Sequence, residues 1–381
     1  MINVPFRKYH LLSFLNALKE TVPMDVQLRD YLKNNKAIGS KDRAYIADTA
    51  YTLMRWKGLL DYILGSENDW EGRLKLLEEK GIDALKFTKD LPDHVKFSFP
   101  KFLYEALSRS FETEELFPLL SVLNEKAPIC IRANALKIDR DDLFDKWSDE
   151  YPIQKTEESP YGIVFEDRVN LFGLEEFKKG FFEVQDEASQ LVGLKIEAKP
   201  GDCVLDFCSG SGGKTLCFAP FMENKGQIYL HDVRKHALKE AKKRLKRAGI
   251  QNAQLIENTE TQKLSKLKRK MDWVLVDAPC TGTGTLRRNP DMKWKLTEET
   301  LKRLLGLQRT IFEQALSYLK PNGIIAYATC SLLKEENEDQ VAHFLKTYPL
   351  ELIEPPFATI PKRKEKDGLF VALFKKVEKI K

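Results

Sequence analysis

Two cysteines follow two apolar runs of the chain, each in a turn rich in small and hydroxyl residues. Cys280 lies in the segment DAPCTGTG (277–284), and Cys330 lies in YATCS (327–331). If both runs are strands of a parallel sheet, their carboxyl ends meet at one edge, so both thiols are expected to face a shared crevice. A lone cysteine at a strand end is usually an inert packing residue. Two of them beside a candidate cofactor loop favour chemistry.

A pair of thiols suits methyl transfer to carbon 5 of cytosine, which is a poor nucleophile. Addition of a thiolate to carbon 6 makes an enamine, so that carbon 5 can attack an electrophilic methyl group. A second thiol can assist release of the first. Asp277 is placed to hydrogen-bond the ring nitrogen and the exocyclic amine. Lys214 and helix amino termini can lower the pKa of a thiol.

The glycine-rich segment VLDFCSGSGGKT (204–215) follows a strand candidate and opens a helix. A nucleotide-binding P-loop needs a glycine where Cys208 stands, and a dinucleotide fold needs one at Thr215. Asp232 is placed to bind ribose hydroxyls of a nicotinamide or an adenosyl cofactor. Asp206 favours S-adenosylmethionine, because the sulfonium and amino groups of that cofactor are cationic. Taken alone, the loop leaves an NTPase, a dinucleotide enzyme, a methyltransferase and a purely structural glycine turn open.

Three regions are expected to position these residues: a helical bundle over 1–126, a small α/β module over 127–184 and a doubly wound, mostly parallel α/β sheet over 185–381. Strand candidates of the sheet are 203–207, 227–231, 253–256, 272–277 and 323–328, and its helices are 235–247, 297–319 and 335–347. Short strand-like runs in the module are 129–132, 163–165 and 170–172. The segments 350–353 and 369–374 are expected to close the sheet.

The composition describes a globular chain with an ordinary core. Its 381 residues are 43% hydrophobic and 31% charged, with a net charge of +5, which excludes wholesale disorder. Apolar runs are too short to span a membrane, and no signal peptide is apparent. Six cysteines without a CxxC pair and five histidines predict reduced thiols and no metal site. We therefore expect a soluble, cytoplasmic protein. Cys130, Cys203 and Cys217 are expected in the core.

At these motifs the chain resembles the Sun/RsmB-type RNA (cytosine-5) methyltransferases. The resemblance rests on FEVQDEASQ (182–190), LDFCSGSGGKT (205–215), LVDAPCTGTGTLRRNPDMKW (275–294), YATCSLLKEENE (327–338) and DGLF (367–370). It implies a Rossmann-like methyltransferase fold that uses S-adenosylmethionine to methylate RNA.

The same resemblance implies a role for each site residue. Cys330 corresponds to the nucleophile, Cys280 to the release cysteine, and Asp277 and Lys214 to residues that contact the target cytosine. DNA cytosine methyltransferases use the cysteine of their Pro-Cys motif as nucleophile, so Cys280 is the alternative for the first step. The cofactor contacts implied are Asp206, Cys208, Ser209, Gly210, Ser211, Gly212, Gly213, Lys214, Asp232, Arg234, Asn258 and Asp277.

Three positions depart from the family pattern. The usual loop reads CAAPGGKT, whereas Cys208 is here followed by Ser209, Gly210 and Ser211. Asn258 stands where an aspartate usually contacts adenine, and Leu369 replaces a phenylalanine. None of these changes touches the two thiols. A non-catalytic RNA-binding protein on this fold, or a P-loop-like NTPase, remains the alternative.

An RNA substrate is the expected partner, most simply ribosomal RNA, with transfer RNA as an alternative, and the chain is expected to act as a monomer. Segment 131–137 (IRANALK) resembles the start of the family's RNA-binding module, and the first 126 residues resemble a NusB-like domain. Basic side chains crowd one helix, as a solvated face or an RNA contact: Arg234, Lys235, Lys239, Lys242, Lys243, Arg244, Lys246 and Arg247. A second group, expected to contact phosphates, is Arg287, Arg288, Lys293 and Lys295. Trp294 is a candidate for base stacking or for the core.

Overall fold

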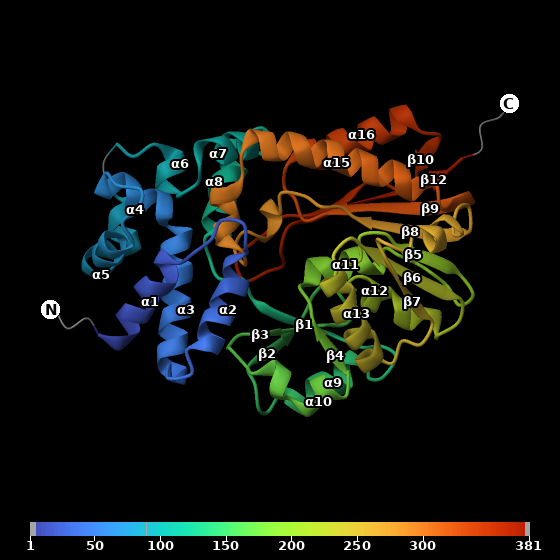
Figure 1. Cartoon of the computed structure of the whole chain (residues 1–381), viewed down its shortest axis with the longest axis horizontal. Helices are drawn as coiled ribbons and strands as arrows, with labels where there is room; N and C mark the ends of the chain where they lie inside the picture. Colours follow the sequence, from blue (N-terminus) through green and yellow to red (C-terminus); the bar gives the residue numbers. More distant parts are fainter. Residues whose placement is uncertain (1–4, 89, 378–381) are drawn as a thin grey trace. The chain divides into compact units, whose positions relative to one another are not determined.

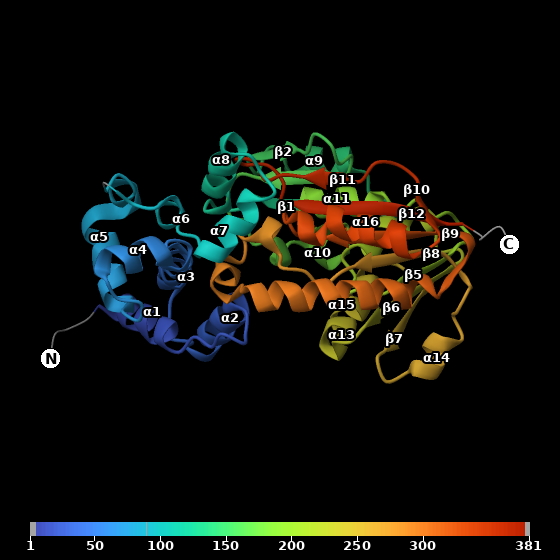
Figure 2. The same ribbon diagram turned by 90° about the horizontal axis from the view of Figure 1, so that it is seen from above.

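The computed structural model of the chain describes residues 5–88 and 90–377. It divides into two compact units: one comprises residues 1–126 with 285–300, and the other comprises 127–284 with 301–381. Figures 1 and 2 show the elements of each unit in two views. In the described part of the chain, no helix has the length and apolar character that a membrane crossing requires. No group of three or more potential metal-ligating side chains occurs there either.

The first unit is helical, as its apolar spacing predicts. In α3, for example, Ile46, Ala50, Leu53 and Met54 recur on one face and are all buried. The helices are α1 (Phe6–Asn16), α2 (Met24–Asn34), α3 (Ser40–Arg55), α4 (Lys57–Leu64), α5 (Trp70–Lys86), α6 (Asp93–Lys96), α7 (Lys101–Ser108) and α8 (Thr113–Leu123). The short 3-10 helix η4 (Pro290–Lys295) belongs to the same unit.

Two of the four basic side chains expected to contact phosphates, Arg287 and Lys293, are buried, which corrects the expectation for these two. Arg288 and Lys295 are partly exposed, and a phosphate contact there stays a prediction. The Lys293 side chain is fully buried, and its ammonium donates hydrogen bonds to the carbonyl oxygens of Arg55 and Ser98 and to Asn124 Oδ1. Arg287 is 1% exposed. Trp294 donates from Nε1 to the carbonyl of Met54 and packs on the helical core. Burial lowers the pKa of Lys293 well below its usual value. The side chains of Lys293 and Trp294 thus hold this loop against the helical core through hydrogen bonds.

Lys295, at the end of η4, forms an ion pair within the same unit. Lys295 pairs with Asp291 at 2.7 Å, and Asp291 in turn accepts from the backbone N–H of Met24.

The second unit begins with a small module whose four strands form an antiparallel sheet in the order β2-β3-β1-β4. Its elements are β1 (Ile129–Ala133), α9 (Arg140–Trp147), β2 (Ile153–Lys155), β3 (Gly162–Phe165), η1 (Leu171–Gly173), α10 (Glu175–Lys178) and β4 (Phe182–Val184). Trp147, Phe165 and Phe182 form its aromatic core. The strand expected at 170–172 is wrong: Gly173 donates its N–H to the carbonyl of Asn170, which closes a 3-10 turn.

The larger sheet carries the candidate site, and its strand order is β10-β12-β9-β8-β5-β6-β7, with β11 paired to β12. The strands are β5 (Cys203–Asp206), β6 (Gln227–Asp232), β7 (Ala253–Glu257), β8 (Met271–Asp277), β9 (Leu319–Thr329), β10 (Leu350–Leu352), β11 (Phe357–Thr359) and β12 (Leu369–Lys376). Strands β5 to β9 pair in parallel, while β10, β11 and β9 pair with β12 antiparallel. This arrangement confirms the doubly wound, mostly parallel sheet.

Both faces of this sheet are buried, which explains its continuous apolar runs. Successive side chains of β5 point to opposite faces of the sheet. Val204 packs on one face with α11 (Glu187–Leu194), α12 (Thr215–Phe218) and α13 (Lys235–Ala248). Leu205 packs on the other face with α15 (Glu298–Leu316) and α16 (Glu338–Thr347). Figure 1 shows the two helical layers on either side of the strands. The short helices α14 (Thr261–Ser265), η2 (Ala219–Met222), η3 (Thr283–Thr285) and η5 (Lys334–Glu336) lie in connections.

The strand order places a topological switch point between β5 and β8. The chain proceeds from β5 outward to β6 and β7, then returns to β8 on the other side of β5. Crevices in such sheets form outside the carboxyl ends of the strands at this point. Asp206 ends β5 and Asp277 ends β8, so the glycine-rich loop and the first cysteine turn leave the sheet side by side.

Candidate active site

The two thiols meet at the carboxyl edge of the sheet, as the sequence predicts. The sulfur atoms of Cys280 and Cys330 lie 3.4 Å apart, and both cysteines are free and partly exposed. The hydrogen bond with Cys280 lowers the pKa of Cys330 below the ordinary value of a thiol, although burial and the charge of Asp277 oppose it; Lys214 adds a smaller lowering effect. The same hydrogen bond, together with burial, raises the pKa of Cys280. Cys330 is therefore the thiol that ionises more readily.

The two cysteine turns are fastened to each other by backbone hydrogen bonds. Gly284 donates its N–H to the carbonyl of Cys330 at 2.9 Å, and its own carbonyl accepts from Gly368 at 3.0 Å. A Cβ at Gly284 would collide with the carbonyl oxygen of Gly368, so this close approach requires glycine. The DGLF segment thereby supports the turn that carries Cys280.

The buried carboxylate of Glu336 also connects the two cysteine turns. Glu336, in the segment after Cys330, accepts from the backbone N–H of Thr281 at 3.0 Å, from the Thr281 hydroxyl and from Gln308 Nε2 at 2.8 Å. Burial raises the pKa of Glu336, although these donors oppose the rise. Glu336 lies in the motif YATCSLLKEENE (327–338), but the sequence alone does not indicate that it joins the two cysteine turns. Its contacts fix the residue next to Cys280 against the Cys330 loop.

An ion pair stands beside the thiols. Lys214 Nζ lies 2.6 Å from Asp277 Oδ2, and the lysine side chain is almost completely buried. Burial alone would lower the pKa of Lys214, but the attraction of Asp277 leaves it above its usual value, so the ammonium stays charged. The glycine-rich loop supplies the lysine and the end of β8 supplies the aspartate.

The glycine-rich loop turns tightly after β5. Gly212 donates its N–H to the carbonyl of Ser209 at 2.8 Å, and Gly210 and Gly212 both have positive φ, at 53° and 77°. Asp206 accepts a hydrogen bond of 2.6 Å from the Thr215 hydroxyl through Oδ2. Its Oδ1, like Ser209 Oγ, is buried with no hydrogen-bond partner in the described part of the chain. Burial raises the pKa of Asp206 to about 7.

Asp232, at the end of β6, faces the same loop. Its carboxylate accepts from the backbone N–H of Gly210 at 2.8 Å and from the backbone and guanidinium of Arg234. Burial alone would raise the pKa of Asp232, but these donors hold it below the usual value. Asn258 follows β7 and is exposed. The expected cofactor residues therefore lie along the carboxyl ends of β5, β6, β7 and β8.

Cys130, Cys203 and Cys217 pack in cores, as expected. Cys130 and Cys217 are buried, and Cys203 packs against the apolar cluster on the α15 side of the sheet. Cys208, within the glycine-rich loop, packs against the same cluster, and burial raises its pKa, so its thiol stays protonated.

Two arginines of α13 do not form a solvated face. Arg244 and Arg247 both pair with the buried carboxylate of Glu183, and Arg244 also donates to Ser211 in the glycine-rich loop. Gln185 donates to the carbonyl of Gly213 at 3.1 Å. Sequence reasoning missed these supports, because Glu183 and Arg244 are 61 positions apart and only the local FEVQDEASQ motif marks the region.

Two family models match the chain. The model "16S rRNA methyltransferase RsmB/F" matches residues 194–375, and the model "Methyltr_RsmF/B-like, ferredoxin-like domain" matches residues 99–171. The first match contains the glycine-rich loop and both cysteines.

Two relatives and one solved structure illustrate the similarity. The ribosomal RNA small subunit methyltransferase B of Vibrio vulnificus is 30% identical over 74% of this chain and 67% of its own length. The mouse 28S rRNA (cytosine-C(5))-methyltransferase is 30% identical over 70% of this chain and 34% of its own length. The crystal structure of NSun6 from Pyrococcus horikoshii with SFG, an S-adenosylmethionine analogue, covers 74% of this chain and 99% of its own, with 23% identity and a TM-score of 0.66. The fold and site thus define a methyltransferase, and the chain belongs to the RsmB/F family of ribosomal RNA methyltransferases.

Proposed function

We propose that this chain methylates carbon 5 of a cytosine in ribosomal RNA with S-adenosylmethionine as the methyl donor. The observation that carries the proposal is the pair of reduced thiols 3.4 Å apart, beside the ion pair of buried Lys214 with partly exposed Asp277 at the switch point of the sheet. Methyl transfer to an oxygen or an exocyclic nitrogen needs no thiol, because those atoms are already nucleophilic. Activation of cytosine carbon 5 does need one.

We assign the first step to Cys330, whose pKa is lowered. Its thiolate bonds to carbon 6 of the cytosine, and the electron pair displaced onto carbon 5 takes up the methyl group, while the pair of the broken S–C bond stays on the donor sulfur. Lys214 and Asp277 face this position, where the pair can hydrogen-bond the ring as its charge changes.

The second thiol completes the cycle. Once methylated, carbon 5 still bears its proton, which Cys280 or a water beside it removes. The electron pair of that C–H bond then forms the C5–C6 double bond, the C6–S bond breaks, and the thiolate of Cys330 is restored. To act as the base Cys280 must itself be ionised, and its position 3.4 Å from the sulfur of Cys330 places it beside the adduct.

The loop fits the proposed cofactor. S-adenosylmethionine supplies an electrophilic methyl group on a cationic sulfur. A buried carboxylate oxygen without a partner among the described residues, Asp206 Oδ1, is suited to a cationic group. The carboxylate of Asp232 already accepts from Gly210 and Arg234, so ribose hydroxyls would bind it in place of the Arg234 guanidinium. We assign Gly210, Gly212 and Gly213 to the close backbone approach, and Arg234 and Asn258 to the adenosine end. Asp206 Oδ1 thereby gains a partner that the described residues do not supply.

The proposal of ribosomal RNA as the substrate is based on the relatives, which are named as ribosomal RNA methyltransferases. A cytosine must leave its stack to reach Cys330 between the two turns. We propose a single chain acting in the cytoplasm on ribosomal RNA, with the module over 127–184 and the helical unit as RNA-binding parts. Transfer RNA is the competing substrate in the test below.

The test supplies the purified chain with methyl-labelled S-adenosylmethionine and either unmodified ribosomal RNA or transfer RNA. After digestion to nucleosides, we expect labelled 5-methylcytidine from ribosomal RNA and none with Cys330→Ala. Label in another nucleoside would contradict the chemistry, and label in transfer RNA alone would contradict the substrate. RNA binding without methylation would instead identify a non-catalytic RNA-binding protein.

A further inference from the structure

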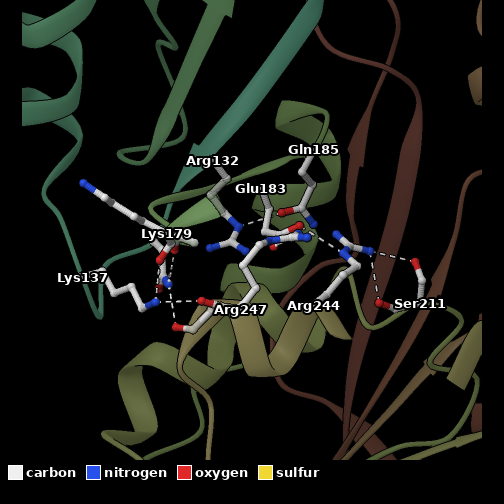
Figure 3. Close-up of polar contacts among 11 residues, drawn as sticks. Arg132, Lys137, Lys179, Glu183, Gln185, Ser211, Arg244 and Arg247 are labelled. Atoms are coloured by element: carbon white, nitrogen blue, oxygen red, sulfur yellow. Dashed lines mark hydrogen bonds and ion pairs between the residues drawn. The ribbon is translucent and has the colours of Figure 1, made fainter. Parts of the chain in front are cut away.

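Glu183 and Gln185 flank the end of β4 and point toward α13 and the glycine-rich loop (Figure 3). Glu183 is 3% exposed, so a carboxylate there needs charged partners. Arg244 Nε donates to Glu183 Oε2 at 3.0 Å, and Arg247 Nη2 donates to Oε1 at 2.5 Å. The two arginines, one helical turn apart, thus share one buried acid.

Arg244 differs from Arg247 in having a second contact. Its Nη1 donates to the Ser211 hydroxyl at 2.7 Å and to the Ser211 carbonyl at 3.1 Å. In a trans peptide the carbonyl of Ser211 and the N–H of Gly212 point in opposite directions. Holding that carbonyl therefore directs the N–H of Gly212 toward the carbonyl of Ser209, which closes the turn of the loop.

Gln185 holds the loop two residues further on. The amide oxygen of Gln185 accepts from Arg132 Nε at 2.7 Å, so its amide nitrogen is directed to the carbonyl of Gly213 at 3.1 Å. Arg132 is itself buried, which leaves the amide little freedom to turn over. The loop is thus held through two carbonyls by side chains from outside it.

Further hydrogen bonds join the module that carries Glu183 to the end of α13. Lys137 donates to the carbonyls of Lys179 and Arg247, both at 2.7 Å, and so joins the module to the last turn of α13. Asn134 makes the same kind of bridge between Gly180 and Ala248. Figure 3 shows the Lys137 contacts beside Glu183 and its two arginines. The arginines of α13 are therefore presented to the loop from a fixed helix.

We propose that Arg244 and Gln185 are positioning residues that hold the glycine-rich loop in the form that binds S-adenosylmethionine. This inference rests on the proposed function, since it concerns the same loop. Arg244 and Gln185 touch neither thiol, so they act on cofactor affinity and not on the reacting atoms. Glu183 and Arg132 orient them, which gives the FEVQDEASQ motif a physical role.

Arg247 provides a matched control, because it pairs with the same carboxylate and is similarly buried, at 19% against 15% for Arg244. We expect Arg244→Gln to weaken S-adenosylmethionine binding about tenfold by calorimetry on the full chain, corresponding to about 1.4 kcal/mol. Arg247→Gln should leave the dissociation constant within about twofold of the wild type, the precision expected of such a comparison. Thermal unfolding should report similar destabilisation of both variants, so that a difference in binding is not a difference in folding.

Two further readouts separate positioning from a general structural effect. In methylation assays Arg244→Gln should raise the KM for S-adenosylmethionine with kcat nearly unchanged, and Arg244→Lys, which keeps the charge, should recover part of the affinity. Gln185→Glu keeps the shape but cannot donate to Gly213, and should also raise that KM. Equal dissociation constants for wild type and Arg244→Gln, or equal losses in both arginine variants, would overturn the inference. A wild-type chain that binds no S-adenosylmethionine would contradict the proposed function instead.

Discussion

The pKa of Asp206 makes cofactor binding pH-dependent in a way that can be calculated. Burial raises this pKa to about 7, so near neutral pH about half of the molecules carry a protonated Asp206 in the cofactor-free form. If the cationic cofactor requires the carboxylate, the apparent dissociation constant varies as 1 + 10^(pKa − pH). It should fall about 15-fold between about pH 5.5 and about pH 7.0. Asp232 stays ionised throughout this interval, because its pKa is lowered.

Calorimetry without RNA measures this effect directly. At about pH 6.5, binding should release nearly one proton, about 0.8, detected as a dependence of the measured enthalpy on the ionisation enthalpy of the buffer. Asp206→Asn should bind weakly and with no pH dependence across the same interval. A wild-type dissociation constant that stays flat, or an asparagine variant with the same slope, would refute the role of Asp206.

The stability of the cofactor-free protein supplies the control. A raised folded-state pKa contributes stability that is fully present below the unfolded-state pKa and is lost as the pH rises through about 7. Above that pH, ionised Asp206 costs up to about 4 kcal/mol, since one pKa unit corresponds to about 1.36 kcal/mol. The melting temperature of cofactor-free Asp206→Asn at about pH 8 should therefore be no lower than that of the wild type. Weak cofactor binding by this variant at that pH then cannot be attributed to unfolding.

Three other predictions concern groups whose surroundings are equally well defined. Cys330, with its lowered pKa, should react with iodoacetamide at a lower pH than Cys280, as peptide mass spectrometry of partly alkylated protein can measure; equal pH profiles would contradict the thiol assignment. Glu336→Gln should reduce that difference, because the amide NH2 that replaces Oε2 cannot accept from the Thr281 hydroxyl, and an unchanged profile would show that Glu336 does not set the thiol contact. Lys293→Met should destabilise the helical unit by about 3 kcal/mol, because three buried oxygens lose their donor; thermal unfolding with no loss would contradict this reading.

Much of the larger sheet could be predicted from the sequence, for a physical reason. Strands such as β5 and β8 are buried on both faces, so they appear as apolar runs that end in a charged residue and a glycine-rich or proline-containing turn. The convergence of Cys280 and Cys330 follows from the parallel order alone. Roles for these residues stay predictions until they are tested.

Other features depend on contacts that local patterns do not encode. The segment 170–172 is apolar and short, and short apolar runs do not distinguish a strand from a turn. Lys293 and Arg287 are basic residues near a cysteine motif, and only the tertiary structure shows that both are buried. Likewise Glu183 and Arg244 gain meaning from their contact across 61 residues.

The most direct test of the central claim examines the covalent step. The chain and its Cys280→Ala and Cys330→Ala variants are incubated with ribosomal RNA and S-adenosylmethionine and then separated on a denaturing gel. We expect Cys280→Ala to accumulate a protein–RNA adduct, because the thiolate of Cys330 still adds but release is impaired. Cys330→Ala should form no adduct and no 5-methylcytidine. The opposite pattern would show that Cys280 is the nucleophile, and two variants that retain methylation without any adduct would contradict the thiol mechanism itself.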